Sequence, residues 1–286
     1  MTNFALIASS TFSPNLWSDL REMWQYSFMQ HAFETGTVIA LVAGIVGYFV
    51  VLRRLSFAAH ALSHAGFAGA AGAVLMGINP LFGLLTFTSL GGLAMAALGK
   101  KAASRDVQIG NVLAFMLGLG VLFISLYKGY ATEAYSLLFG EILGISTTNV
   151  FLTIAAAILI LLAVIVLYRR LLFTSLDEDV AEAKGISMLG MNIAFMLLVA
   201  VAVSVSVEVV GVLLIFALLV TPAAIAQQVT KNPRHGLIVS ALVALVATWF
   251  GLFISYYAPY PVSFFIVSLV FATYLIVRLI KHLTTQ

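Results

Sequence analysis

The stretch that decides the fold is residues 149–168, NVFLTIAAAILILLAVIVLY, which carries no charged side chain over its whole length. The hydrocarbon core of a bilayer requires about 20 consecutive apolar residues in a spanning helix. Inside lipid, every backbone polar group must be satisfied within the segment, and a helix meets that requirement for a single long run. The stretch therefore predicts a transmembrane α-helix.

Further runs of the same kind lie on both sides of it. They cover residues 34–52, 57–77, 80–99, 110–128, 187–204, 207–226, 237–257 and 262–280. The runs that end at residue 204 and begin at residue 207 almost merge, so the count is eight or nine. We predict an all-α fold, a polytopic membrane helical bundle with eight or nine transmembrane helices. Residues 34–286 form a single transmembrane domain, and residues 1–33 form an extracytoplasmic or interfacial segment.

The composition excludes a soluble globular protein. Of the 286 residues, 62% are hydrophobic and 9% are charged, with a mean hydropathy of +1.11, whereas soluble domains are about 45–50% apolar. The chain has no cysteine, which excludes disulfides and thiolate metal sites. It also has no GxxxxGK[ST] phosphate-binding loop, so any ATP must be hydrolysed on another chain. We expect a transporter subunit and not an enzyme, in contact with membrane lipid and not with nucleic acid.

Lysine and arginine orient the chain, because these residues accumulate on the cytoplasmic side of a membrane. With nine spans, Arg21 and Lys128 fall on one side. The other twelve basic residues fall on the opposite side: Arg53, Arg54, Lys100, Lys101, Arg105, Arg169, Arg170, Lys184, Lys231, Arg234, Arg278 and Lys281. This distribution places the N-terminus outside and the C-terminus in the cytoplasm.

Ionisable side chains at membrane depth are rare and often functional. His60 and His64 are four residues apart in the span 57–77, so a helix presents both rings on one face, where two imidazoles can hold one divalent ion. The alternative is a packed pair that is hydrogen-bonded to Ser63 or to the backbone. Glu208, near the outer end of its span, is either a transport residue or a carboxylate that faces water at the headgroup level.

Four segments, in this order, resemble the ABC-3-type permeases, the membrane subunits of bacterial zinc, manganese and iron(II) importers. They are VVLRRLSFAAHALSHAGFAGAAGAVLMG (50–77), FGEILGIS (139–146), LDEDVAEAKGI (176–186) and VEVVGVLLIFALLVTPAAIAQQVT (207–230). The resemblance implies a permease of the bacterial inner membrane. It also implies a second copy of the permease, two cytoplasmic ATPase subunits and an extracytoplasmic metal-binding protein as partners.

The resemblance further implies a translocation path lined by an aspartate and a histidine four residues apart. His64 matches the family histidine, and His60 stands where the family usually has aspartate. We therefore expect His60 and His64 to form a metal gate. Because imidazole suits zinc better than manganese, zinc is the expected substrate, with manganese or iron(II) as the alternative. No permanently bound cofactor is expected.

The predicted cytoplasmic and outer loops carry further expectations. The family match implies that residues 221–236 dock on the ATPase, with Pro222 ending the preceding helix and a short helix following it. The coupling residues are expected to be Thr221, Pro222, Ala223, Ala226 and Gln227. A capping box from Ser175 to Glu178 predicts a short helix in the loop 169–186, and residues 129–148 are expected to be interfacial or re-entrant.

Two other classes of function remain open on the residues alone. One is a secondary carrier, whose uptake would depend on an ion gradient. The permease of an ATP-driven metal importer would instead copurify with an ATPase. An intramembrane enzyme is disfavoured because no paired nucleophile and base, and no HExxH motif, is present.

Overall fold

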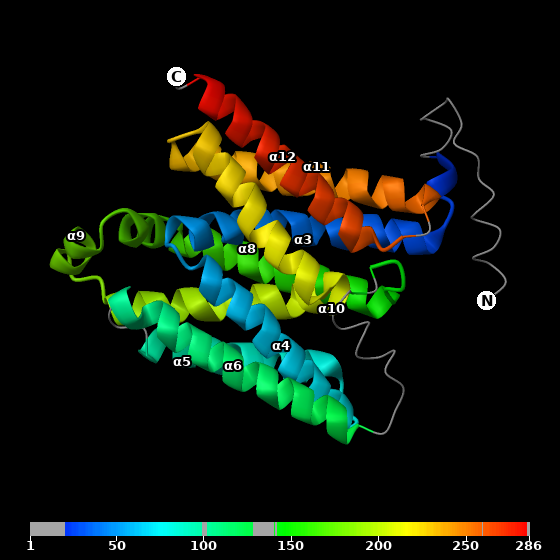
Figure 1. Ribbon diagram of the computed structural model, residues 1–286, viewed down its shortest axis with the longest axis horizontal. Coiled ribbons are helices and arrows are strands. Elements are labelled where there is room, and N and C mark those ends of the chain that lie inside the picture. The colour runs from blue at the N-terminus through cyan, green and yellow to red at the C-terminus, as the bar shows by residue number, and fades with distance from the viewer. Residues whose placement is uncertain (1–20, 99–101, 128–139, 141, 259, 285–286) are drawn as a thin grey trace.

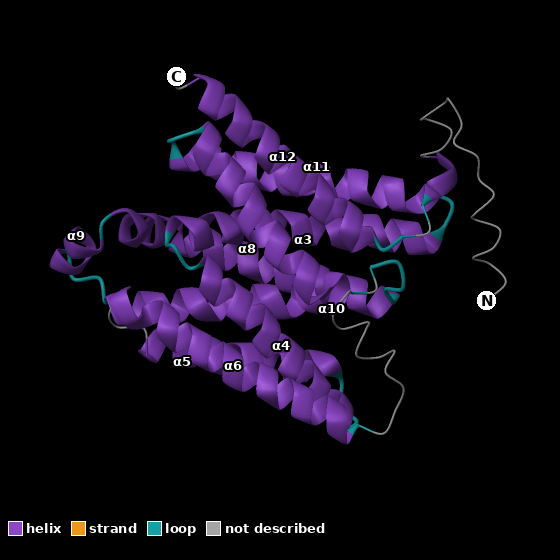
Figure 2. Cartoon of the chain, viewed as in Figure 1, coloured by secondary structure: helices purple, strands orange, loops and turns teal. Residues whose placement is uncertain are grey.

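The computed structural model describes residues 21–98, 102–127, 140, 142–258 and 260–284 (Figure 1). All regular structure in these ranges is helical (Figure 2). The helices are α3 (Ser27–Leu52), α4 (Ser56–Leu75), α5 (Pro80–Leu98), α6 (Ala102–Leu126), α8 (Thr147–Leu176), α9 (Glu178–Ala183), α10 (Met188–Val229), α11 (Pro233–Tyr257) and α12 (Val262–Thr284). Most of the expected segment 129–148, and residues 1–20 of the expected segment 1–33, lie outside the described residues.

The predicted membrane bundle is confirmed, with a lower count of spans. Seven helices in the described part of the chain are long and apolar enough to cross a membrane, against the eight or nine predicted. One difference is α4, which is 20 residues long but less apolar, because glycine, alanine and two histidines make up much of it. The other is that the runs 187–204 and 207–226 belong to one 42-residue helix, α10.

Gly211 divides α10 into two halves. Its backbone, at φ 80° and ψ 166°, is non-helical, and glycine adopts such a conformation without the penalty that a side chain would bring. Figure 1 shows the ribbon turning back on itself there, so the two halves run in different directions. Gly140 packs against this turn: a Cβ on Gly140 would lie 2.3 Å from the carbonyl carbon of Val210. The two predicted spans are thus two halves joined by a sharp bend rather than by a loop.

The second half of α10 returns to the end of the bundle that carries most of the basic residues. In Figure 1 this end also holds α9 and the C-terminus, while α3 and α8 both begin at the opposite end. In the predicted orientation, the α9 end is the cytoplasmic one.

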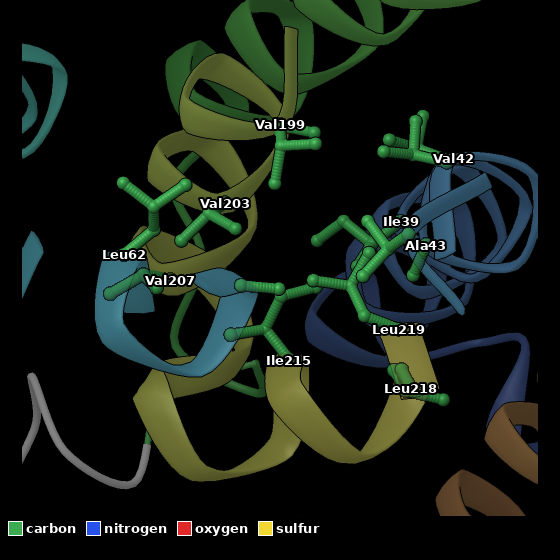
Figure 3. Close-up of a cluster of buried hydrophobic side chains, with 14 of the residues drawn as sticks. Ile39, Val42, Ala43, Leu62, Val199, Val203, Val207, Ile215, Leu218 and Leu219 are labelled. Carbon is green, nitrogen blue, oxygen red and sulfur yellow. The ribbon is translucent and has the colours of Figure 1, made fainter. Parts of the chain in front are cut away.

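The main core surrounds α10, which packs against α3, α4, α5 and α12. In Figure 3, aliphatic side chains from three helices meet. They are Ile39, Val42 and Ala43 of α3, Leu62 of α4, and Val199, Val203, Val207, Ile215, Leu218 and Leu219 of α10, all buried. Branched aliphatic side chains of this kind interdigitate closely, which holds α3 and α4 on opposite sides of α10.

Helices α4 and α5 cross at a pair of glycines. A Cβ on Gly69 would lie 2.1 Å from the carbonyl oxygen of Gly83, and a Cβ on Gly83 would lie 2.0 Å from that of Gly69. Helices associate in membranes largely through such close backbone approach, because lipid offers no hydrophobic driving force between them. The small residues of α4 therefore serve packing within the chain at this crossing.

Gly69→Val is expected to destabilise the bundle by about 1–3 kcal/mol or more, since the new side chain has no room at the crossing. Thermal unfolding of the purified chain in detergent measures this as a lower midpoint. Gly118→Ala is the matched control, because a Cβ on Gly118 of α6 would meet nothing within 4 Å. Equal midpoints for Gly69→Val and wild type would show that the crossing is not tight.

Candidate metal site on α4

The two predicted histidines lie together on α4. The centroids of the His60 and His64 rings are 4.6 Å apart, and the ring planes are nearly perpendicular, at 84°. His60 also contacts Phe216 in the second half of α10, with ring centroids 4.6 Å apart. The four-residue spacing therefore places both imidazoles on one helical face, as predicted, next to the helix half that follows the Gly211 bend.

This face is the exposed side of an otherwise buried helix. From Ala58 to Ala73, every residue is buried except His60 and His64, which are partly exposed. Leu62 lies between them in sequence and points the other way, because two residues correspond to about 200° around a helix. Leu62 is buried against the first half of α10 (Figure 3), so core packing turns the two histidines outward.

The Nδ1 atoms of both histidines are buried and have no hydrogen-bond partner in the described part of the chain. Ser63, which could have bonded to them, donates its hydroxyl to the Ala59 carbonyl oxygen at 3.1 Å instead. The hydrogen bonds expected of a merely packed pair are therefore not formed. A buried imidazole nitrogen without a hydrogen-bond partner is costly, and in the tautomer in which that nitrogen carries a lone pair a metal ion could satisfy it.

The described residues bring only two possible metal-ligating side chains together here, His60 and His64. Among the described residues, no group of three or more His, Cys, Asp or Glu side chains could hold a metal ion. Glu208 accepts a hydrogen bond from the Asn149 side-chain amide at 3.4 Å, at the start of α8. The remaining ligands of an ion at His60 and His64 would have to come from water or from another chain.

Arg53 holds the turn that leads into α4, a role that sequence reasoning missed. Its guanidinium donates to the Thr174 hydroxyl at 3.1 Å and to the side-chain oxygen of Asn192, and it stacks over the Phe195 ring at 5.0 Å. These contacts join the end of α3 to α8 and α10 at the α9 end of the bundle. In the sequence, Arg53 could be assigned only as a basic residue flanking a span, because its partners lie far along the chain.

The predicted coupling segment has a different form from the one expected. Pro222 does not end the helix: α10 continues through it to Val229, and only residues 230–232 separate α10 from α11. A proline leaves one carbonyl of the preceding turn without its usual donor, a loss that helices in a membrane bundle tolerate. No separate short helix follows Pro222, so the expectation of a loop with its own helix at 221–236 was wrong.

The named coupling residues lie mostly inside the protein. Ala223 and Ala226 are fully buried and pack with Tyr48 of α3. Thr221 and Gln227 are partly exposed, and the Gln227 side-chain nitrogen is buried without a partner among the described residues. These residues join α10 to α3 and leave the turn 230–232 and the start of α11 as the exposed part of the segment.

The short helix expected in the loop 169–186 is present as α9, although with a different cap. Asp177, not Ser175, caps it: the Asp177 carboxylate accepts from the Val180 N–H at 3.0 Å, while the Ser175 hydroxyl bonds back to the Leu171 carbonyl oxygen within α8. Lys184 stacks over the Phe173 ring at 4.9 Å. α9 is exposed except for Ala181, so it projects from the bundle as a small capped helix.

Comparison with known proteins identifies relatives along most of the chain. The manganese transport system membrane protein MntC of Listeria monocytogenes is 32% identical over 83% of this chain and 85% of its own length. The manganese import system permease protein ScaB of Streptococcus gordonii is 33% identical over 83% of this chain and 85% of its own length. The structure of PsaBC from Streptococcus pneumoniae in complex with Fab aligns with a TM-score of 0.82 at 30% identity, covering 92% of this chain and 95% of that one.

The ABC 3 transport family model matches residues 25–281. The match includes α4 with both histidines, α9 and all of α10. Together with the helical bundle, it makes this chain a multi-pass protein of a bacterial membrane and the permease subunit of a transporter whose ATPase is a separate chain. The resemblance drawn from the four sequence segments is confirmed, and the chain belongs to the ABC 3 transport family.

Proposed function

We propose that this chain is the permease of an ATP-driven importer for divalent manganese. The observation that carries the proposal is the 32–33% identity to relatives named as manganese permeases, over 83% of the chain. It favours manganese over zinc, the substrate that imidazole ligands alone had indicated, and over iron(II).

The chemistry of the histidine pair is compatible with manganese. Manganese stands at the weak end of the affinity order of divalent first-row metals and prefers oxygen ligands, including water. Two imidazoles from one chain would hold a partly hydrated manganese ion loosely. A conducted ion must bind well enough to enter and weakly enough to leave. Zinc held by four nitrogen ligands in a tetrahedral site would bind far more tightly than manganese held by two imidazoles. Such tight binding suits a closed structural site better than a path through which the ion must pass.

A second copy of the chain would complete this path. His60 and His64 lie on a partly exposed face, beside exposed apolar side chains such as Phe57 of α4 and Leu213 of α10, 41% and 49% exposed. Imidazoles that faced lipid at this depth would be costly. A second permease covering the same face would remove the histidines from lipid and bring two pairs to one pathway.

The ATPase would dock on the cytoplasmic end. α9 fits the requirement for a rigid projection anchored to two long helices, since it joins α8 to α10 and is capped at its start. The turn at residues 230–232 offers a second exposed contact. Thr221, Pro222, Ala223, Ala226 and Gln227 would transmit movement from that turn to α3 through Tyr48, rather than contact the ATPase themselves. The outer ends of the helices would receive ions from an extracytoplasmic metal-binding protein.

His60→Asp tests the proposal, because it replaces one nitrogen ligand by the oxygen ligand that manganese prefers. We expect the ratio of manganese uptake to zinc uptake to rise about tenfold, which corresponds to about 1.4 kcal/mol of preference. Both uptakes are measured in the same membrane vesicles carrying the complete transporter. His60→Asn, which has the same shape without the charge, is the control. An unchanged ratio in His60→Asp would remove His60 from the ion path.

A further inference from the structure

An apolar groove lies on the side of the bundle away from α4, between α3, α8 and α11. It encloses about 430 Å³ and is lined by Met23, Trp24, Phe33, Glu34, Thr37, Val38, Ile154 and Trp249. This volume falls within the ~300–1,000 Å³ typical of small-molecule sites. All the lining residues except Glu34 and Thr37 are apolar or aromatic, so the groove is suited to hydrocarbon.

The groove opens in the outer half of the membrane. Val38 lies about three turns from the start of α3, Ile154 lies about two turns from the start of α8, and Trp249 lies about two turns before the end of α11. At 1.5 Å per residue, Ile154 and Trp249 lie about 10–12 Å below the ends of their helices. Tryptophan gathers at the boundary between lipid and water, and Trp24, 55% exposed in the turn before α3, lies at this end of the groove.

Fixed contacts hold the aromatic walls in place. The Trp249 indole N–H donates to the Thr37 hydroxyl at 2.8 Å, and the Trp249 ring meets Phe33 edge-on at 6.5 Å between centroids. Phe33 in turn lies 6.2 Å from the Trp24 ring. The Gln30 side-chain amide donates to the Trp24 carbonyl oxygen at 2.6 Å, which anchors the turn before α3. A preformed apolar surface of this kind loses little entropy when a chain settles on it.

Glu34 is the one charged residue in the lining, and it is exposed. No cation among the described residues forms an ion pair with it. A carboxylate in the lining of an apolar groove complements an ammonium group attached to a hydrocarbon chain and repels an anionic headgroup. Twelve of the fourteen lysine and arginine residues belong to the opposite side of the membrane in the predicted orientation, and Arg21, at the same end as the groove, does not line it.

We propose that this groove is a binding site for one lipid of the outer leaflet that carries a primary-amine headgroup, of the phosphatidylethanolamine type. One acyl chain lies along Val38, Ile154 and Trp249, and the headgroup ammonium lies at Glu34. The lipid bridges α3, α8 and α11 at the end where these helices are farthest from the cytoplasmic anchor at Arg53. The site lies outside the proposed ion path and does not depend on which metal is carried.

Quenching of tryptophan fluorescence by brominated acyl chains tests the site directly. The chain has three tryptophans, and Trp17→Phe with Trp24→Phe leaves Trp249 as the only reporter. The full-length chain is placed in phosphatidylcholine nanodiscs that contain a small fraction of brominated phosphatidylethanolamine, phosphatidylglycerol or phosphatidylcholine. We expect half-maximal quenching at a severalfold lower fraction of the ethanolamine lipid than of the other two.

In Glu34→Gln, half-maximal quenching by the ethanolamine lipid should require the same lipid fraction as quenching by phosphatidylcholine. In Glu34→Lys, phosphatidylglycerol should quench at the lowest fraction of the three lipids. Glu22→Gln is the control, because Glu22 is an exposed acid near the same end that does not line the groove. Equal quenching by all three lipids in the Trp249-only chain would show ordinary annular lipid and overturn the proposal. Absence of quenching would also overturn it, since another segment, such as residues 1–20, would then cover the groove.

Discussion

Manganese uptake is expected to fall about tenfold or more when His60 or His64 is replaced by alanine. Each substitution removes one of two imidazoles whose Nδ1 atoms have no protein partner among the described residues, so an ion would lose a ligand without any compensating contact. A loss of about 1.4 kcal/mol of binding at the barrier corresponds to a tenfold change in rate. Initial uptake rates in vesicles with the complete transporter measure the effect.

The same two variants should fold and assemble normally. Both histidines are partly exposed, and neither forms a hydrogen bond that holds α4 in place. ATPase association and thermal stability should therefore match wild type. His282→Ala, at an exposed position near the end of α12, is the matched control for loss of an imidazole. Normal uptake in both His60→Ala and His64→Ala would mean that the two rings only pack against each other, with His60 also against Phe216.

Val180→Arg is expected to abolish ATPase association and with it all uptake. Val180 is 43% exposed on α9, an apolar side chain at the tip of an acidic helix, as expected of the centre of a contact. An arginine there adds bulk and charge to the docked surface. It leaves the Asp177 cap intact, because that bond uses the backbone N–H of residue 180. Copurification of the ATPase with the permease measures association.

The loss of ATPase association should depend on the position of Val180 on α9 and not on adding an arginine to any exposed site. The control is therefore an exposed site at the opposite end of the bundle. Glu22→Arg at the outer end adds the same side chain to an exposed position and should leave the ATPase bound. Ala226→Arg is a poor test of docking, because Ala226 is fully buried and the change would disturb the packing on Tyr48. Wild-type association in Val180→Arg would assign docking to another surface.

Much of the fold was predictable because apolar length determines where helices cross a bilayer. The ends of most spans agree with the prediction within a few residues, and α5 and α12 begin at the predicted residues, 80 and 262. The bend in α10 was not predicted; the sequence showed only that the apolar runs 187–204 and 207–226 almost join. A single glycine at positive φ can reverse a chain without a polar loop, and nothing in the hydropathy of residues 204–212 indicates it.

Features that depend on contacts between distant residues were harder to predict. The proline rule placed a helix end at Pro222, yet packing of Ala223 and Ala226 on Tyr48 keeps the helix intact. The cap of α9 moved from Ser175 to Asp177 because the Ser175 hydroxyl is used inside α8. The spacing of His60 and His64 gave their common face correctly, whereas the unsatisfied nitrogens and the outward direction of that face required the structure.

Ligand type and transport make opposite demands on a metal site. Two imidazole ligands suggested zinc because zinc prefers nitrogen ligands more than manganese does. Such ligand preferences describe a site that retains its ion. A transport path has the opposite requirement, since its ion must leave, and weak binding is then an advantage. The relatives named for manganese, at 32–33% identity, favour this second interpretation.

The most direct test of the central claim is a comparison of ATP-dependent manganese and zinc uptake by the wild-type transporter. The permease is reconstituted with its ATPase and its extracytoplasmic binding protein, and initial rates are measured with each radioactive ion at equal free concentration. We expect saturable manganese uptake that exceeds zinc uptake and is lost in His64→Ala. Zinc uptake that is faster than manganese uptake under the same conditions would contradict this expectation.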